Sequence, residues 1–348
     1  MSFRIIEISK NARNIYSSYI SEWENFVYNN PLGNVFQSSN YAKLFSEKLL
    51  DWNLLILLKS GQIIGGMLSQ VWPYVGLKCY RFSNFKTVYG PLFVDSEKEV
   101  SLHLRYMLNK IAVKKPLRHL ILTYQANIIK ELKNKGYYDV PHGIQGTFII
   151  DLKKTENDLW KSLEKRCRYS IKHAQKFGIK VLKINNDLSP HLYYNIHIET
   201  AKRLNIPPNP LSFYLNIWRK MTDKYADFFF AFFDNKPVAG IIIFKYKDNA
   251  YLYSSGLLKE YKNTYAMNLL IWNAILDLKR KGFRFLDMLF HPDKNDKKSP
   301  EYGLYLFKRS FGGKEIPVFY FEKIFSPKLS IISQKVSELY KTIKFSVS

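Results

Sequence analysis

Two segments of the chain, residues 52–71 and 226–244, share one pattern of hydrophobic and polar positions. Each consists of an apolar run, a short polar turn and a second apolar run, which is typical of two β-strands joined in a hairpin. Gly65 and Gly240 occupy equivalent places early in the second strands. A repeated unit of this size indicates a duplicated domain rather than a solenoid. The polar turns are Lys59–Gln62 and Asp234–Pro237.

Segments with helical periodicity precede and follow both hairpins. An order of helices, antiparallel strands, helix and strand that occurs twice predicts an α+β fold with helices on the sheet faces. Pro141, Gly143 and Gly146 cluster at the expected boundary, so the domains are predicted as 1–145, completed by 318–348, and 146–317. The expected helices are 22–28, 41–50, 100–113, 158–177, 188–204, 265–281 and 327–343, and the other expected strands are 147–152, 250–256 and 283–290.

Charge is the strongest compositional signal. The 348 residues include 53 Lys and Arg against 29 Asp and Glu, which gives a formal net charge of +24. Such a field attracts polyanions, namely RNA, anionic lipid surfaces or phosphate-bearing substrates. The lysines are spread along the whole chain, however, so a surface whose lysines only interact with solvent is an equal alternative.

The residues available for metal or disulfide chemistry are few. Cys79 and Cys167 have no paired spacing, and the seven histidines are scattered, so neither a disulfide framework nor a metal site is expected. The longest apolar runs have the length of strands, far below the roughly 20 residues of a membrane-spanning helix. With no signal-peptide pattern at the N-terminus, a soluble, cytoplasmic protein is expected.

One predicted helix, residues 158–177, is cationic on one side. Its apolar positions recur on one face, and its basic positions fall on the opposite face. A row of this kind can engage phosphates without reading bases, while a solvated helix face remains the alternative. Arg166 lies near the apolar edge, where an idle guanidinium is less expected. The candidate phosphate-binding residues are Lys161, Lys165, Arg166, Arg168 and Lys172.

Two segments, Leu163–Gly178 and Leu304–Gly313, resemble the Fem-type (FemABX) peptidyltransferases. The resemblance extends over nearly the whole chain. It implies two tandem domains with the N-acetyltransferase-like (GNAT) fold and, because no long heptad insertion is present, no coiled-coil arm. It also implies an acyltransferase that moves an amino acid from aminoacyl-tRNA to an amine of a peptidoglycan-type precursor.

The resemblance assigns roles to several residues. Lys308 would stabilise the oxyanion of the tetrahedral intermediate. Asp287 interrupts an apolar strand. Either Asp287 or a substrate carboxylate would accept the proton of the amine, and a core hydrogen-bond role for Asp287 is equally open. Glu199 and Arg203 are spaced to pair on a helix. The residues implied in substrate binding are Arg203, Tyr214, Tyr253, Phe307 and Arg309, with Tyr41, Tyr89 and Asp95 in the first domain.

The loop 259–267 helps to distinguish coenzyme A from aminoacyl-tRNA as the donor of the transferred group. It contains no glycine, so a nest of backbone N–H groups for the pyrophosphate of coenzyme A is not expected, and no cofactor is predicted. The expected partners are tRNA, a nucleotide- or lipid-linked envelope precursor and an anionic membrane surface, with the protein a monomer. Two alternatives stay open: an acyl-CoA N-acyltransferase acting on an amino sugar or amino acid, and a non-catalytic RNA- or lipid-surface-binding protein.

Overall fold

A computed structural model describes residues 3–9, 17–45, 51–73, 83–94, 97–140, 144–299, 301–332 and 335. The chain divides into two compact units, Met1–Gly143 with Val318–Ser348, and Ile144–Pro317. The division expected from the sequence put this junction between residues 145 and 146. Within the described ranges, no helix combines the length and the hydrophobicity that crossing a bilayer requires.

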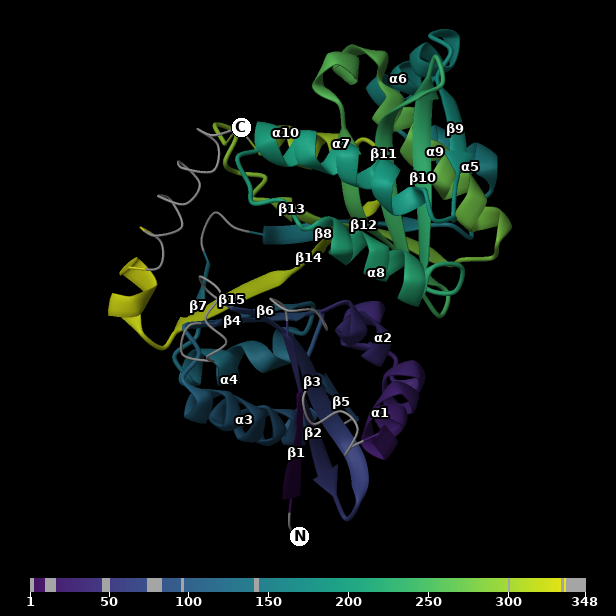
Figure 1. Cartoon of the computed structure of the whole chain (residues 1–348). Helices are drawn as coiled ribbons and strands as arrows, with labels where there is room; N and C mark the ends of the chain where they lie inside the picture. The colour runs from purple at the N-terminus through teal and green to yellow at the C-terminus, as the bar shows by residue number, and fades with distance from the viewer. Residues whose placement is uncertain are drawn as a thin grey trace. The chain divides into compact units, whose positions relative to one another are not determined.

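The first unit contains one mixed sheet with helices on both faces (Figure 1). Its elements are β1 (Phe3–Ser9), α1 (Ser17–Asn29), η2 (Val35–Gln37), α2 (Ser39–Ala42), η3 (Lys43–Phe45), β2 (Asp51–Lys59), β3 (Gln62–Pro73), β4 (Ser83–Val88), β5 (Leu92–Phe93), α3 (Glu97–Lys114), β6 (Arg118–Thr123), η5 (Ala126–Ile128), α4 (Ile129–Asn134), β7 (Tyr138–Asp139) and β15 (Phe319–Ile324).

The second unit has the same construction. Its elements are β8 (Ile144–Asp151), α5 (Glu156–Ser162), α6 (Lys165–Lys176), β9 (Lys180–Lys183), α7 (Ser189–Arg203), α8 (Leu211–Met221), β10 (Ala226–Phe233), β11 (Lys236–Tyr246), β12 (Asn249–Leu257), η6 (Lys259–Thr264), α9 (Ala266–Arg280), β13 (Phe285–Pro292), α10 (Tyr302–Arg309) and β14 (Lys314–Pro317).

The two sheets have the same strand order. In the first unit it is β1-β2-β3-β4-β6-β15-β7, and in the second, read from its other end, β9-β10-β11-β12-β13-β8-β14. In each sheet the fourth and fifth strands are parallel, whereas the neighbouring pairs are antiparallel. Strand β8 thus holds in the second unit the place that β15 holds in the first. The predicted α+β class and duplication are confirmed.

The two hairpins explain the repeat in the sequence. Both have two-residue turns with left-handed backbone, Ser60-Gly61 and Asp234-Asn235, and both have a β-bulge just beyond the turn. Counted from these turns, Gly66 and not Gly65 is the counterpart of Gly240, which corrects the sequence-based alignment. A Cβ on Gly66 would lie 2.3 Å from the ring of Trp23, and one on Gly240 3.1 Å from that of Tyr193. Gly66 therefore lets α1 pack closely on the first sheet, and Gly240 lets α7 pack closely on the second.

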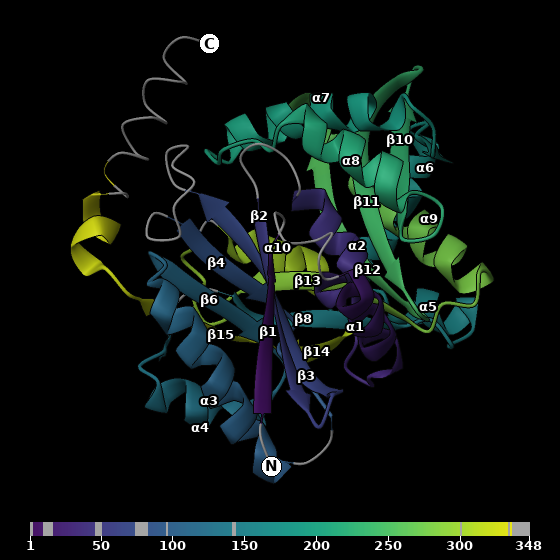
Figure 2. The same cartoon turned by 60° about the horizontal axis from the view of Figure 1, so that its bottom comes forward.

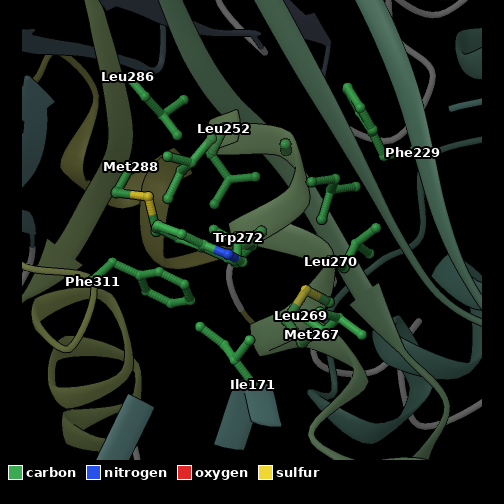
Figure 3. Close-up of a cluster of buried hydrophobic side chains, with 14 of the residues drawn as sticks. Ile171, Phe229, Leu252, Met267, Leu269, Leu270, Trp272, Leu286, Met288 and Phe311 are labelled. Carbon is green, nitrogen blue, oxygen red and sulfur yellow. The ribbon is translucent and has the colours of Figure 1, made fainter. Parts of the chain in front are cut away.

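Each sheet is covered by helices on both faces. In the second unit, α7 and α8 pack on one face and α9 on the other, with α6 against α9 (Figure 2). Figure 3 shows the core on the α9 side, where Trp272 lies among Leu252, Met288 and Phe311, and Ile171 of α6 points inward. In the first unit, α3 and α4 cover the core that contains Leu55, Phe85 and Phe321.

One predicted helix, 158–177, is two helices. The backbone is extended at Leu163 and Glu164, so α5 ends at Ser162 and α6 begins at Lys165. The helical segment begins at Glu156, before the predicted residue 158, and ends at Lys176. Thr155 accepts a hydrogen bond from Asp158 N at 3.1 Å as N-cap, and Gly178 follows α6 with φ +88°. The five apolar positions 159, 163, 167, 171 and 174 are all buried despite the break.

The end of the chain returns to the first unit, where β15 pairs with β6 and β7. A helical turn follows from Pro327, and Arg118 donates hydrogen bonds to Ser330 Oγ from Nε at 2.9 Å and from a terminal nitrogen at 2.6 Å. Most of the predicted helix 327–343 lies outside the described residues.

Candidate active site

The sheet of the second unit opens at Asp287. Strands β12 and β13 pair only from Asn249–Phe285 to Tyr251–Asp287, whereas their counterparts β4 and β6 stay paired from Asn84–Arg118 to Val88–Leu122. Beyond Asp287, strand β13 pairs with β8 on its other side. The backbone of β13 after Asp287 therefore needs hydrogen-bond partners other than β12.

A bulge in β13 follows immediately. Leu289 has φ +53°, an uncommon conformation for a residue with a branched side chain. The Asp287 carboxylate stabilises it by accepting a hydrogen bond from Leu289 N at 2.7 Å. The hydroxyl of Thr147 on β8 lies 2.5 Å from the same carboxylate oxygen and 3.0 Å from Leu289 O. Asp287 is 3% exposed, so the hydrogen bonds by which its carboxylate holds the bulge are buried.

Lys308 of α10 contacts this bulge from the other side. Its Nζ donates hydrogen bonds to the carbonyl oxygens of Met288 at 2.7 Å, Leu289 at 3.2 Å and Phe290 at 2.7 Å. An ammonium has three donors, so all three are engaged. Burial lowers the pKa of Lys308 to about 8, while the negative charge of Asp287 opposes that shift.

The structure therefore brings the two predicted catalytic residues together, but in an unexpected setting. If Lys308 had no catalytic role, its ordinary setting would be a solvated strand edge. Instead it lies on a helix, and its ammonium is held by backbone carbonyls. An oxyanion would have to replace one of these carbonyls. The catalytic roles of Lys308 and Asp287 stay predictions.

The neighbours of Lys308 hold α10 in place. Arg309 Nε donates to Glu164 at 2.8 Å, so its guanidinium is paired within the unit. Phe307 is half-buried and packs edge-on against Phe311 at 5.3 Å. Gly312 has φ +75°, and a Cβ there would lie 2.2 Å from the carbonyl oxygen of Ser162. Gly312 therefore permits a close approach of the backbone to the end of α5.

The residues expected on the acceptor side lie on α7, α8 and β12. The predicted pairing of Glu199 with Arg203 is wrong, because Glu199 accepts a hydrogen bond from Lys259 N at 2.7 Å and Arg203 is exposed. Tyr214 is fully buried, and burial raises the pKa of its phenol. Tyr253 is half-buried and stacks on Phe244 at 4.0 Å.

The loop before α9 is folded into a short helix. Residues 259–264 form the 3-10 helix η6, and Tyr265 adopts the left-handed conformation with φ +55°. Thr264 Oγ1 accepts a hydrogen bond from Ala266 N at 3.2 Å. One of the first N–H groups of α9 is thus already engaged.

The basic residues of the 158–177 segment are divided between its two helices. Lys161 lies on α5, and the exposed Lys165, Arg166 and Lys172 lie on α6. Arg168 has a structural role, because it donates hydrogen bonds to the carbonyls of Lys161, at 3.1 Å, and Leu163 and so satisfies the end of α5.

Comparison with known proteins finds one family model that matches part of the chain. A model of the FemAB family matches residues 125–236, a range that runs from the end of the first sheet through α6 and the hairpin turn of the second. Over this range the chain is similar to the FemAB family, as the resemblance in the sequence led us to expect. Among curated proteins no sequence matches the chain.

Solved structures resemble nearly the whole chain in fold. The crystal structure of FemX has a TM-score of 0.69 and 14% identity, over 92% of this chain and 98% of that one. A tandem GNAT protein from the clavulanic acid biosynthesis pathway gives 0.62 and 9%, over 94% and 99%. L-PGS from Bacillus licheniformis gives 0.57 and 14%, over 92% and 95%. The tandem GNAT-like fold is confirmed, and the match to the FemAB family together with this fold supports an enzyme of the acyltransferase type.

The first unit brings the predicted residues Tyr41 and Tyr89 together around Phe36. The ring of Phe36 packs edge-on against Tyr41 at 5.2 Å and Tyr89 at 5.5 Å. Gln37 ties the same region to the sheet by donating to Val88 O at 2.9 Å. Tyr41 and Tyr89 are both 3% exposed. Asp95 lies outside the described residues.

Sequence reasoning missed two members of the bulge. Thr147 appeared only as the first residue of an expected strand, yet its hydroxyl joins β8 to Asp287. Leu289 gave no signal, because left-handed backbone is usually read from Gly or Asn. Only the isolated acid in an apolar strand pointed to this place.

Proposed function

We propose that the chain is an aminoacyltransferase that moves an amino acid from aminoacyl-tRNA to an amine of a peptidoglycan-type precursor. The observation that carries the proposal is the junction of Asp287, Thr147 and Lys308 where β12 and β13 separate, in a chain that matches the FemAB family over residues 125–236. A cationic group and a fixed backbone there suit a reaction that develops negative charge on a carbonyl oxygen.

The reaction needs little covalent participation by the protein. The acceptor amine attacks the ester carbonyl, the C–N bond forms, and the ester C–O bond breaks to release the 3′-terminal ribose hydroxyl of tRNA. The proton lost by the amine passes to a base and finally to that hydroxyl. The enzyme positions the two substrates and stabilises the developing oxyanion. In this proposal Lys308 provides the positive charge, and Asp287 fixes the bulge that orients it.

Acyl-CoA is the alternative donor, and the structure of the loop before α9 favours tRNA over it. In η6 the backbone is helical, and the N–H of Ala266 is already bound by Thr264. We therefore expect acetyl-CoA to show no micromolar binding in a calorimetric titration. Micromolar affinity would favour an acyl-CoA N-acyltransferase instead.

Binding of tRNA should depend steeply on salt. Each phosphate that a lysine or arginine neutralises releases counterions, so affinity falls as salt rises. The net charge of +24 and the exposed Lys165, Arg166 and Lys172 support such binding. A filter-binding series with deacylated tRNA at several salt concentrations measures it. A flat response, or no binding at low salt, contradicts the assignment of the donor.

The pH dependence of transfer should report Lys308. The ammonium loses its proton as pH rises through about 8, so kcat/KM should fall above that pH. In Lys308→Arg this falling limb should be absent, because a guanidinium stays charged. Deprotonation of the acceptor amine raises kcat/KM as pH rises, because the amine must be neutral to attack.

The pH dependence of stability shows whether activity is lost because Lys308 loses its proton or because the protein unfolds. The pKa of Lys308 is 10.5 in the unfolded chain and about 8 in the folded one. Between these two pH values the unfolded state therefore binds more protons than the folded state. The free energy of unfolding should therefore rise over this window while activity falls. Parallel loss of both would contradict the role of Lys308.

The chemical class of the acceptor can be tested in the same assay. L-PGS from Bacillus licheniformis shares the fold, so phosphatidylglycerol vesicles are a suitable competitor to a nucleotide-linked muropeptide. We expect an amide product on the muropeptide and no ester on the lipid. A lipid ester would keep the aminoacyltransferase reaction and replace the acceptor.

A further inference from the structure

The outer side of α6 carries an exposed row of rings. Tyr169, His173 and Phe177 follow one another at intervals of four residues, so they share one face of the helix. Tyr169 is 61% exposed and Phe177 44% exposed. Figure 3 shows Ile171 of the same helix pointing into the core, so the packing of α6 is already provided by its other face.

Rings from two other segments extend this row. The ring of Tyr265 lies near that of Tyr169, with 6.5 Å between the ring centroids, and edge-on to that of His173, with 5.2 Å between the centroids. Phe233 is the last residue of β10, and its ring centroid lies 4.9 Å from that of Phe177. The ring centroid of Tyr261 lies 6.0 Å from that of Phe233. We call the six rings the aromatic row: Tyr169, His173, Phe177, Phe233, Tyr261 and Tyr265.

Positive charge surrounds the aromatic row. Residues 165–183 contain seven lysines and arginines and no acid. Two neighbouring acids are paired, Glu164 with Arg309 at 2.8 Å and Glu260 with Lys236 at 2.7 Å, whereas Asp234 directly follows Phe233. Lys236 also lies over the ring of Tyr261 at 5.2 Å. Exposed cations that flank the row on α6 are Lys165, Arg166, Lys172 and Lys176.

We infer that the aromatic row is a stacking surface for unpaired nucleotides of RNA. A duplex offers phosphates but hides the faces of its bases, so a basic surface alone binds it adequately. Unpaired bases expose their faces, and proteins that bind them combine basic surfaces with aromatic rings. The inference rests on the proposed tRNA donor for its choice of RNA, and it adds that this face contacts unpaired nucleotides.

The test compares two RNAs with equal numbers of phosphates, an unstructured adenine-rich oligonucleotide and a hairpin duplex, by fluorescence anisotropy. For Tyr169→Ala/Phe177→Ala we expect affinity for the oligonucleotide to fall by about tenfold or more, with the duplex and the salt slope unchanged. Lys172→Ala should weaken both RNAs and reduce the slope. Tyr28→Ala, which removes a 58% exposed tyrosine of the first unit, is the matched control.

Several outcomes would overturn the inference. An equal loss for both RNAs, or no loss for either, means that the rings do not stack on bases. A change only in self-association would indicate a protein contact instead. In each case aminoacyl transfer by the wild-type protein can persist, so the proposed function survives. Absence of binding to any RNA contradicts both, whereas stacking without transfer contradicts only the proposed function.

Discussion

Replacing Lys308 by alanine should lower the single-turnover rate of transfer by roughly a hundredfold or more, the loss typical of removing one donor to a developing oxyanion. The carbonyls of Met288, Leu289 and Phe290 would also lose their shared donor. Stability should therefore fall as well, by about 1–3 kcal/mol, because buried acceptors are left unpaired. Both quantities are measurable on one sample, by quench-flow and by thermal unfolding.

The control variants separate charge from structure. Lys308→Arg keeps the charge but replaces a compact ammonium with a planar fork, so it should restore the rate only in part. Lys314→Ala removes a nearby exposed lysine and should change neither quantity. If Lys308→Ala transfers at nearly the wild-type rate, the catalytic role is wrong. A lower melting temperature alone would leave Lys308 with a structural role.

Gly312→Ala should destabilise the protein by about 2–5 kcal/mol. The new Cβ would meet the carbonyl oxygen of Ser162 at 2.2 Å, and φ +75° is unfavourable for alanine. Because Gly312 joins α10 to the end of α5, the strain would also displace Lys308. Denaturant unfolding measures the first effect, and the rate of transfer at low temperature the second.

The same helix provides a matched control. Gly303 lies in α10, and a Cβ there would meet nothing within 4 Å. Gly303→Ala should therefore leave stability unchanged or raise it by about 0.5–1 kcal/mol, since glycine within a helix is unfavourable. Equal stability of the two alanine variants would show that the approach to Ser162 is not close.

The fold was predictable because its signals are local and repeated. Alternating strands, turn residues and glycines mark both hairpins, and these sufficed for the α+β class and the duplication. The break at Leu163 and Glu164 was not predictable, because the apolar spacing of four continues across it and the interruption depends on tertiary contacts such as that of Arg168 with the end of α5.

The candidate site was predictable only in part. An acid in an apolar strand and a lysine between Phe307 and Arg309 indicated two residues that do meet at one bulge. What they contact depends on pairing between distant strands, which spacing along the chain does not encode. Tyr214 and Glu199 illustrate the same limit, since burial and a backbone partner, not helical spacing, determine their surroundings.

The most direct test of the central proposal is transfer itself. Purified protein would be incubated with tRNA charged with labelled amino acids and with a nucleotide-linked muropeptide, and the product identified by mass spectrometry. We predict a new amide on the muropeptide that forms from intact aminoacyl-tRNA and is abolished by prior ribonuclease treatment. Transfer from acyl-CoA, with none from aminoacyl-tRNA, would contradict the account.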